Sequence, residues 1–384
     1  MRRIVIITGN SFPNGDAGAV RQAAMCKAFH KIGYIPFVYG MGPSTDFKIK
    51  TFDNIEYISL RSGKTSKISK IIERITFANR AVKDINNRFE RIDAVLVIDV
   101  YPWAFSKIEK IAKKKNAHLI HDSVEWYSKE EFRLGIFDFQ YLCKEYTNRI
   151  GINKQWRVIA ISKYLYSHFR KNKNRVVRIP VIMDSNEYIP NYNLNANKVR
   201  FIYAGSPGKK DYLYNILCGF AKLDNNSLSF IEIHIAGITE EQLNKDCAVP
   251  RAIIEKLRHS LRIHGRVSRS EAIKLVSESN YSLLFRDSSL RYAKAGFPTK
   301  VVESLMLGTP PLCNYSSDLQ CYLKDGVNAI IAKDHSIESI ARSIKKAISM
   351  EKTSIEKMRR EARKTGELFF DYRNYLNCMK KMIE

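Results

Sequence analysis

The amino-acid sequence predicts an α/β fold made of two parallel-sheet domains. Short, continuous apolar runs such as residues 3–8 (RIVIIT) alternate with longer segments whose apolar residues recur every three or four positions. This alternation is typical of buried parallel strands joined by helices. The same plan starts again near Val199, and 384 residues exceed what one hydrophobic core usually holds. Two domains of ordinary size are therefore expected.

The apolar runs of the first half predict a sheet, and the segments between them predict its helices. Ser162 is expected to cap the helix that follows its strand. The expected strands cover residues 3–8, 34–39, 55–60, 94–100, 118–120, 157–162 and 176–179, and the expected helices cover 19–32, 67–92 and a segment ending at Lys115.

A break rich in Pro and Asn separates the halves, and we place the first domain at residues 1–183 and a linker at 184–198. The second domain is placed at residues 199–366. Its expected strands cover residues 199–204, 231–236, 261–265, 281–285 and 311–314, and its expected helices cover 212–223, 299–307, 337–350 and a basic segment from about 354.

Composition excludes several classes of protein. The seven Cys residues are scattered without a Cys-x-x-Cys pair, which argues against a zinc site or a disulfide framework. No metal site is expected. The apolar run at the amino terminus is too short for a signal peptide, and no segment approaches the roughly 20 apolar residues of a membrane span. We expect a cytoplasmic protein.

The net charge of +25 is concentrated in the first half. Residues 1–183 hold 33 Lys and Arg against 16 Asp and Glu, whereas residues 184–384 hold 31 against 23. Such a basic surface attracts polyanions, and because no nucleic-acid-binding motif is present we favour an anionic membrane surface over nucleic acid. The amphipathic segment 67–92 is either a membrane-surface helix or a helix packed on the sheet with a solvated basic face.

The loop after the first strand carries Gly15 and Gly18 but no Gly-x-Gly-x-x-Gly, so no dinucleotide cofactor is expected. These glycines either let a substrate approach the backbone or form a plain strand-to-helix turn. Arg21, at the start of the next helix, is expected to be a solvated charge rather than a phosphate ligand.

Three ionisable residues, His121, Asp122 and Glu125, follow a predicted buried strand. The carboxyl ends of parallel strands form the edge at which open α/β sheets bind ligands. Asp122 or Glu125 could accept a proton or a hydrogen bond from a bound ligand. The alternative is structural, such as a helix cap at Asp122.

The loop GSPGKKD follows the first strand of the second half. Its Gly205 would allow close backbone approach, and Lys209 or Lys210 would neutralise a diphosphate. Arg286, at the end of the strand over 281–285, points to the same region. A solvated turn is the alternative for the loop.

The segment 293–328 contains a loop broken by Gly296 and Pro298, a short helix from Thr299, and a stop at Gly308 and Pro310. The exposed N–H groups of the helix start suit a phosphate. Lys300 would add a positive charge there, and Glu303, one turn further, could accept the two hydroxyls of a ribose. An ordinary surface helix would show the same spacing.

This segment resembles the donor-nucleotide motif of GT-B glycosyltransferases, in particular retaining glycosyltransferase family 4. In that motif two Glu residues are separated by seven others; the second matches Glu303, and Ala295 stands in place of the first. The form Gly-Phe-Pro-Thr-Lys-x-x-Glu, which includes Phe297, is similar to bacterial capsule and lipopolysaccharide transferases. Diffuse similarity spans nearly the whole chain.

The resemblance implies two Rossmann-like domains that face an interdomain cleft, with residues 367–384 as a terminal helix that returns to the first domain. It implies that His121 contacts the transferred sugar, that Gly205 and Lys210 or Lys209 bind the donor diphosphate, and that Val267 contacts the base. The expected activity is transfer of a sugar, with retention, from a UDP- or GDP-sugar to a lipid-linked oligosaccharide or polysaccharide acceptor at the inner membrane face. The nucleotide-sugar is a co-substrate, and no further cofactor is implied.

Two alternatives remain open. A nucleotide-sugar epimerase could share the fold, although such enzymes are usually neutral to acidic and this chain is strongly basic. A non-enzymatic scaffold that binds polyanions would account for the charge and would show no affinity for nucleotide-sugars.

Overall fold

The computed structural model describes residues 2–13, 17–44, 46–62, 67–192, 194, 198–208 and 210–384. The chain forms two compact units. The first comprises Met1–Met183, Ala295–Phe297 and Tyr372–Glu384, and the second comprises Asp184–Lys294 and Pro298–Asp371. Each unit contains one sheet.

The sheet of the first unit has eight strands among the described residues, in the order β3-β4-β2-β1-β5-β6-β7-β8. All neighbouring strands are parallel except β3 and β4, which form an antiparallel pair at one edge. The strands are β1 (Arg3–Thr8), β2 (Ile35–Pro43), β3 (Lys50–Phe52), β4 (Ile55–Arg61), β5 (Ala94–Ile98), β6 (His118–Ser123), β7 (Arg157–Ala160) and β8 (Arg175–Arg178).

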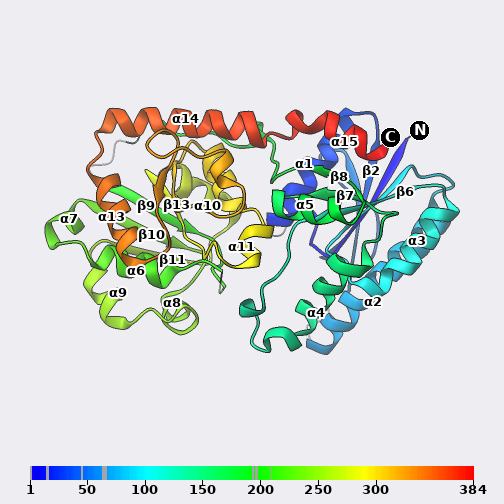
Figure 1. Ribbon diagram of the computed structural model, residues 1–384, viewed down its shortest axis with the longest axis horizontal. Coiled ribbons are helices and arrows are strands. Elements are labelled where there is room, and N and C mark those ends of the chain that lie inside the picture. Colours follow the sequence, from blue (N-terminus) through cyan, green and yellow to red (C-terminus); the bar gives the residue numbers. More distant parts are fainter. Residues whose placement is uncertain are drawn as a thin grey trace. The chain divides into compact units, whose positions relative to one another are not determined.

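Helices connect these strands, and Figure 1 shows α2 and α3 lying side by side along the sheet. The last helix of the chain, α15, packs beside α1, and both contribute to one hydrophobic core with the central strands. The helices of this unit are α1 (Ala17–Lys31), α2 (Lys67–Arg88), α3 (Phe105–Lys114), α4 (Phe139–Tyr146), α5 (Lys163–Lys171) and α15 (Leu376–Ile383).

The central strands are apolar because both faces of the sheet are covered. In β1 the side chains of Ile4 to Ile7 are 0% exposed, and β5 is buried along its whole length. Continuous apolar runs are therefore needed here, in place of the alternating pattern of a half-exposed strand. The carboxyl ends of β1, β5 and β6 lie next to one another at one edge of the sheet.

The sheet of the second unit has six strands among the described residues, all parallel, in the order β11-β10-β9-β12-β13-β14. Its carboxyl edge therefore gathers the loops that follow β9, β12 and β13. The strands are β9 (Val199–Ala204), β10 (Ile231–Ala236), β11 (Leu261–Gly265), β12 (Tyr281–Leu284), β13 (Pro311–Asn314) and β14 (Ile330–Ala332).

Helix α6 packs against α9 and α13, and α12 packs against the long α14. Figure 1 shows α14 running along this unit. The helices are α6 (Leu213–Ala221), α7 (Asn225–Ser229), α8 (Glu240–Cys247), α9 (Arg251–Leu257), α10 (Arg269–Ser277), α11 (Arg291–Ala295), α12 (Thr299–Met306), α13 (Ile337–Ile348) and α14 (Lys352–Phe370).

The predicted strands are confirmed with small shifts of their ends, and Ser162 caps α5 by accepting from the backbone N–H of Leu165. The short edge strands β3 and β14 were not predicted. Helix α2 ends at Arg88 rather than at residue 92, and Ile72, expected on its packed face, is 54% exposed. Because Ala78 and Ile85 are buried, the packed interpretation holds for most of this helix.

The aromatic residues near the carboxyl terminus are divided between the units. Phe369 and Phe370 contact the ring of Tyr322 in the second unit, with centroid distances of 5.4 and 4.9 Å. Tyr372 and Tyr375 belong to the core of the first unit. None of the helices within the described ranges is both long and apolar enough to cross a membrane.

Candidate functional sites

A cluster of charges lies at the carboxyl edge of the second sheet. Lys300, in the first turn of α12, and Arg286, just after β12, both pair with Asp211. The Arg286 Nε atom is 3.0 Å from the Asp211 carboxylate. The hydroxyl of Tyr203 donates to Asp211 over 2.8 Å and accepts from the Lys300 ammonium over 2.7 Å. One carboxylate thus holds two cations, and the cluster keeps a net positive charge.

Burial and the neighbouring charges together set the protonation states of this cluster. Asp211 is 2% exposed, and although burial alone would raise its pKa, the charges of Lys300 and Arg286 lower that pKa to about 2. Burial lowers the pKa of Lys300, and Asp211 opposes that shift. The pKa of the Tyr203 hydroxyl is raised well above its ordinary value, chiefly by burial. Asp211 therefore stays ionised and holds both cations in position.

Gly205 has a structural role that differs from the predicted one. Its φ is +135°, a conformation that side-chain-bearing residues rarely adopt, and a Cβ atom there would lie 2.4 Å from Cε of Lys300. The side chain of Lys300 therefore occupies the space beside Gly205 that we expected a diphosphate to use. Contact of the donor with the Gly205 backbone stays a prediction.

The lysine pair of the same loop is described in part. Lys209 lies outside the described residues. The Lys210 carbonyl accepts from the hydroxyl of Tyr292 over 2.9 Å, and its ammonium lies 5.8 Å from that ring. The Arg286 backbone is fixed by Asn314, whose side-chain amide accepts from the Arg286 N–H over 3.0 Å and donates to its carbonyl over 2.8 Å. Arg286 and Lys210 are thus held at the sheet edge by different neighbours.

Glu303, predicted to bind a ribose, is engaged in the structure. Its Oε1 atom lies 2.8 Å from a guanidinium nitrogen of Arg269 and accepts from the hydroxyl of Tyr188 over 3.4 Å. The same guanidinium donates to the Tyr188 hydroxyl over 2.8 Å. A ribose that bound Glu303 through this oxygen would compete with both contacts.

The remaining predicted donor residues are placed as follows. Val267 is half-buried and directly precedes Ser268, the cap of α10. Gly296 and Phe297 are grouped with the first unit, where the Ser162 hydroxyl donates to the carbonyl of Ala295 over 2.7 Å. Their contacts with a donor stay predictions.

In the first unit, Asp122 forms a buried ion pair with Arg21. The guanidinium donates to both carboxylate oxygens over 3.0 and 2.9 Å, and the two side chains are 0% and 4% exposed. Arg21 also donates to the carbonyls of Ile179 and Pro180. Arg21 is therefore not the solvated charge we expected, and Asp122 is neither a helix cap nor free to act as a base.

The other two candidates differ in exposure. His121 is 3% exposed, and burial together with the charge of Lys144 lowers its pKa to about 3, so its imidazole is neutral. Within the described residues, its Nδ1 atom is buried without a hydrogen-bond partner. Glu125 is half-buried and accepts a hydrogen bond from the hydroxyl of Tyr127, whose pKa is raised by burial and by the Glu125 charge. Of the three, Glu125 best fits a role in proton transfer.

The structure does not test the predicted role of Gly15 and Gly18 in letting a substrate approach the backbone. Gly15 lies outside the described residues, and Gly18 lies in the first turn of α1 rather than in the loop before it. The role of either glycine in substrate approach stays a prediction.

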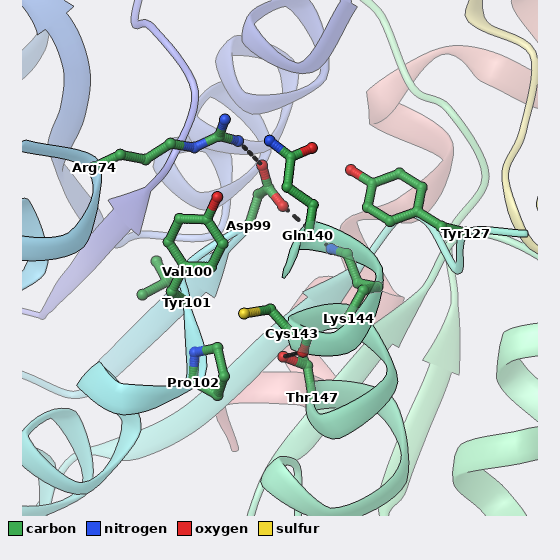
Figure 2. Close-up of a pocket in the computed structure, with 10 residues that line it drawn as sticks. All are labelled: Arg74, Asp99, Val100, Tyr101, Pro102, Tyr127, Gln140, Cys143, Lys144 and Thr147. Atoms are coloured by element: carbon green, nitrogen blue, oxygen red, sulfur yellow. Dashed lines mark hydrogen bonds and ion pairs between the residues drawn. The ribbon is translucent and has the colours of Figure 1, made fainter. Parts of the chain in front are cut away.

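The sequence analysis missed a pocket at the carboxyl end of β5, with about 330 Å³ of free space that includes open solvent. Asp99 lies 3.2 Å from the ammonium of Lys144 and 3.5 Å from the guanidinium of Arg74. Figure 2 shows Asp99 between these two cations, with Gln140 and Tyr127 nearby. The sequence does contain a signal for this site, because Asp99 directly follows the apolar run over residues 94–98.

No group of three or more His, Cys, Asp and Glu residues arranged to hold a metal ion occurs in the part of the chain that the structure describes. The cationic side chains of Lys300 and Arg286 can neutralise a phosphate at the second sheet's edge. Their positive charge fits an anionic group such as a phosphate.

Comparison with known proteins gives a match for just under half of the chain. Residues 184–366 match the family described as glycosyl transferases group 1. This part contains Asp211, Arg286 and Lys300 and is similar to that family. Among curated proteins, no sequence matches the chain.

Solved structures show the fold. A sucrose-phosphate synthase from Thermosynechococcus elongatus is 13% identical, with 100% of this chain and 98% of that one covered and a TM-score of 0.77. HepE of Anabaena in complex with UDP and glucose is 12% identical, with 100% and 99% covered and a TM-score of 0.69. WaaG, a glycosyltransferase involved in lipopolysaccharide biosynthesis, is 12% identical, with 98% and 99% covered and a TM-score of 0.70. The chain thus has the GT-B fold of two Rossmann-like domains.

Proposed function

We propose that the protein transfers a sugar, with retention, from a nucleotide-sugar to a lipid-linked oligosaccharide or polysaccharide acceptor at the inner membrane face. The observation that carries the proposal is the cluster of Lys300, Asp211 and Arg286 within the part of the chain that matches the glycosyl transferases group 1 family. The binding of UDP and glucose by the structural neighbour HepE supports a nucleotide-sugar as the donor.

The cluster fits the departing group of such a donor. Lys300 and Arg286 are 27% and 15% exposed, so both retain access to solvent while Asp211 holds them. Their combined charge exceeds that of the carboxylate, and the surplus can neutralise negative charge that develops on a leaving diphosphate. Catalysis would then rest on positioning and charge stabilisation, with Lys210 as a further cation.

Glu303 would hold the donor ribose after exchanging its contacts with Arg269 and Tyr188 for sugar hydroxyls. On the acceptor side, Glu125 would accept the proton of the attacking hydroxyl. Asp122 is excluded because it forms a buried ion pair with Arg21, and His121 because it is buried and its imidazole is neutral. We assign His121 to contact with the transferred sugar through a neutral ring.

The first unit offers a surface suited to a membrane. Seven apolar side chains of the segment 134–150 are between 47% and 77% exposed, which is unusual for residues of this size. Exposed basic residues lie within or beside the segment, including Arg133 and Arg149. Apolar side chains combined with basic ones favour the interface of an anionic bilayer. The seven residues, which we call the apolar patch, are Leu134, Ile136, Phe137, Phe139, Leu142, Tyr146 and Ile150.

The donor proposal is tested by the thermal stability of the protein with UDP-, GDP-, CMP- and ADP-sugars. A donor that binds the folded state at 100 times its Kd stabilises it by about 2.7 kcal/mol. We expect one nucleotide class to raise the Tm, and we expect Lys210→Ala and Glu303→Ala to reduce that shift.

Two controls sharpen this test. Lys357→Ala removes one exposed positive charge from α14 and should leave the shift unchanged. Glu303→Gln keeps the shape of the side chain but should weaken ribose binding. Absence of a shift with every nucleotide-sugar would refute the donor proposal and would favour the polyanion-binding scaffold.

The membrane proposal is tested by sedimentation with vesicles that contain anionic phospholipid. The wild-type protein should sediment with them, and Phe137→Ser with Ile136→Ser should not. Equal binding of the double variant would show that the apolar patch does not contact lipid.

A further inference from the structure

The pocket at the end of β5 has the composition of a site for an oxyanion. Its charged residues are Arg74 from α2, Asp99 after β5 and Lys144 from α4, which leave a surplus of one positive charge. Three helices or strands that are distant in the sequence therefore direct charge into one place (Figure 2).

Each cation keeps donors beyond its contact with Asp99. The guanidinium of Arg74 has five N–H donors, and one of its nitrogens faces Asp99 at 3.5 Å. The ammonium of Lys144 has three donors and lies 3.2 Å from the same carboxylate. Lys144 is only 11% exposed, so its charge is partly desolvated and acts strongly on a nearby anion.

Neutral polar groups complete the lining of the pocket, among them the hydroxyl of Tyr101 and the side-chain amide of Gln140 (Figure 2). The hydroxyl of Tyr127 donates to Glu125, so Tyr127 lines the pocket without donating into it. Burial raises the pKa of both tyrosines, so their hydroxyls stay protonated. Arg74 and Lys144 also lie 5.4 and 5.6 Å from the rings of Tyr101 and Tyr127, which restricts where the cations can move.

The backbone at Asp99 is held in an uncommon conformation. Its φ is +50°, in the left-handed region, and its carbonyl would lie 2.1 Å from a Cβ atom at position 9. Gly9 is thus required for this arrangement, and its N–H donates to the carbonyl of Ile98 over 2.9 Å. Strained residues of this kind are concentrated at sites of binding and catalysis.

The wall of the pocket formed by α4 continues into the apolar patch. Gln140, Cys143 and Lys144 line the pocket, whereas Phe139 and Leu142 of the same helix are 52% and 50% exposed. An anion-binding pocket next to exposed apolar side chains fits a ligand that carries an anionic group on an apolar chain.

We propose that this pocket binds the phosphoryl group of a lipid-phosphate acceptor, with the lipid chain along the apolar patch. The inference rests on the proposed function for the identity of the acceptor. The site takes an anionic group that could also come from inorganic phosphate, and the experiment separates these sources.

The test measures binding of farnesyl phosphate, farnesol and inorganic phosphate to the full chain without any nucleotide-sugar. Trp103 reports on the pocket, because its ring stacks on Tyr101 with centroids 4.5 Å apart. We expect farnesyl phosphate to change the tryptophan fluorescence with a lower Kd than farnesol or phosphate. Lys144→Gln and Arg74→Gln should each raise this Kd at least about tenfold, since each removes a charge-assisted hydrogen bond.

Asp99→Asn removes a negative charge from the pocket, so unlike Lys144→Gln and Arg74→Gln it should not raise the Kd of farnesyl phosphate. Asn tolerates the left-handed conformation, and the substitution raises the pocket's surplus to two positive charges. Farnesyl phosphate should therefore bind at least as tightly as to the wild type. Lys113→Gln, which removes an exposed charge from α3, should leave the Kd unchanged.

The outcomes separate the possibilities. Equal binding by wild type and Lys144→Gln, or weaker binding by Asp99→Asn, would overturn the assignment of the pocket. Equal affinity for inorganic phosphate and farnesyl phosphate would overturn the lipid part of the proposal. The titration contains no nucleotide-sugar, so a failure of farnesyl phosphate to bind would not affect the result of the thermal-stability panel. If no nucleotide-sugar raised the Tm in that panel, binding of farnesyl phosphate could still be measured.

Discussion

Two clusters in different units share one arrangement: a single carboxylate lies between an Arg and a Lys at the carboxyl edge of a parallel sheet. Asp211 holds Arg286 and Lys300 in the second unit, and Asp99 lies between Arg74 and Lys144 in the first. They differ in burial, since the Asp211 side chain is 2% exposed and that of Asp99 is 25% exposed. In both, the acid orients cations, and the surplus positive charge remains for a ligand.

The pair of Arg21 and Asp122 lies close to the Asp99 cluster in the same sheet but has no surplus charge. One guanidinium faces one carboxylate, and both are buried. We expect the ratio of cations to acids to distinguish a cluster that binds an anion from a structural pair.

The largest effect is expected from Arg21→Ala. Removing the guanidinium leaves Asp122 buried without a counter-charge and leaves two carbonyls without their donor. Loss of one partner of a buried ion pair costs about 3–5 kcal/mol of unfolding free energy. Denaturant unfolding measures this loss. A double variant with Arg21→Met and Asp122→Leu should be more stable than Arg21→Ala, and an equally unstable double variant would contradict a purely structural role.

Gly9→Ala should have the next largest effect. Its Cβ atom would meet the backbone carbonyl of Asp99 at 2.1 Å, and a backbone atom cannot move without shifting β5. We expect a loss of about 3 kcal/mol, near the upper end for overpacking. Gly205→Ala is the matched variant in the other cluster. There the new methyl group meets the flexible end of Lys300, but the φ of +135° strains any residue other than Gly, so stability should fall as well. Donor binding should fall more than in Gly9→Ala, because Lys300 is displaced. Equal donor affinity in the two variants would contradict this comparison.

Asp211→Asn tests the cluster of the second unit through pH. The pKa of Asp211 is lowered from 3.8 to about 2, so its ionised form stabilises the folded state above pH 4. This contribution, about 2 kcal/mol, is lost as the pH falls through about 2. The stability difference between wild type and Asp211→Asn should therefore be full at pH 7 and should shrink between pH 4 and pH 2. A difference that did not depend on pH would show that Lys300 and Arg286 do not set the pKa.

The sequence predicted most of the fold because local signals and tertiary packing agree. The runs at β1, β5 and β9 are mostly apolar and occupy central strands that are largely buried. The edge strand β3 was missed, since its three residues are largely exposed and carry no apolar pattern. Ile72 fits the helical period of α2, but its side chain is 54% exposed.

The candidate sites were predicted less evenly. Lys300 and Arg286 follow from a motif and a strand end, but their partner Asp211 is recognised only when the fold brings it between them. Asp122 was predicted to act as a base or to bind a ligand because it comes near the end of a buried strand. The sequence could not show that the guanidinium of Arg21, 101 residues earlier, neutralises its charge. Asp99 directly follows β5, whereas Asp122 lies within β6, opposite Ile98. The two acids differ in the cations that the folded sheet brings beside them. Those partners cannot be identified from the sequence alone.

Tyr188→Phe should give the smallest effect and refine the role of Glu303. The buried hydroxyl of Tyr188 accepts from Arg269 and donates to Glu303, so its removal should cost about 1 kcal/mol of unfolding free energy. If Glu303 binds the ribose as proposed, the hydroxyl would compete for the same carboxylate oxygen, so the Kd of the donor should stay equal or fall slightly. Tyr214→Phe, at a side chain that is 40% exposed, is the control and should change neither quantity. If Tyr188→Phe instead weakened the donor as strongly as Glu303→Ala, the hydroxyl would be part of the ribose site, and the engaged state of Glu303 would be the binding-competent one.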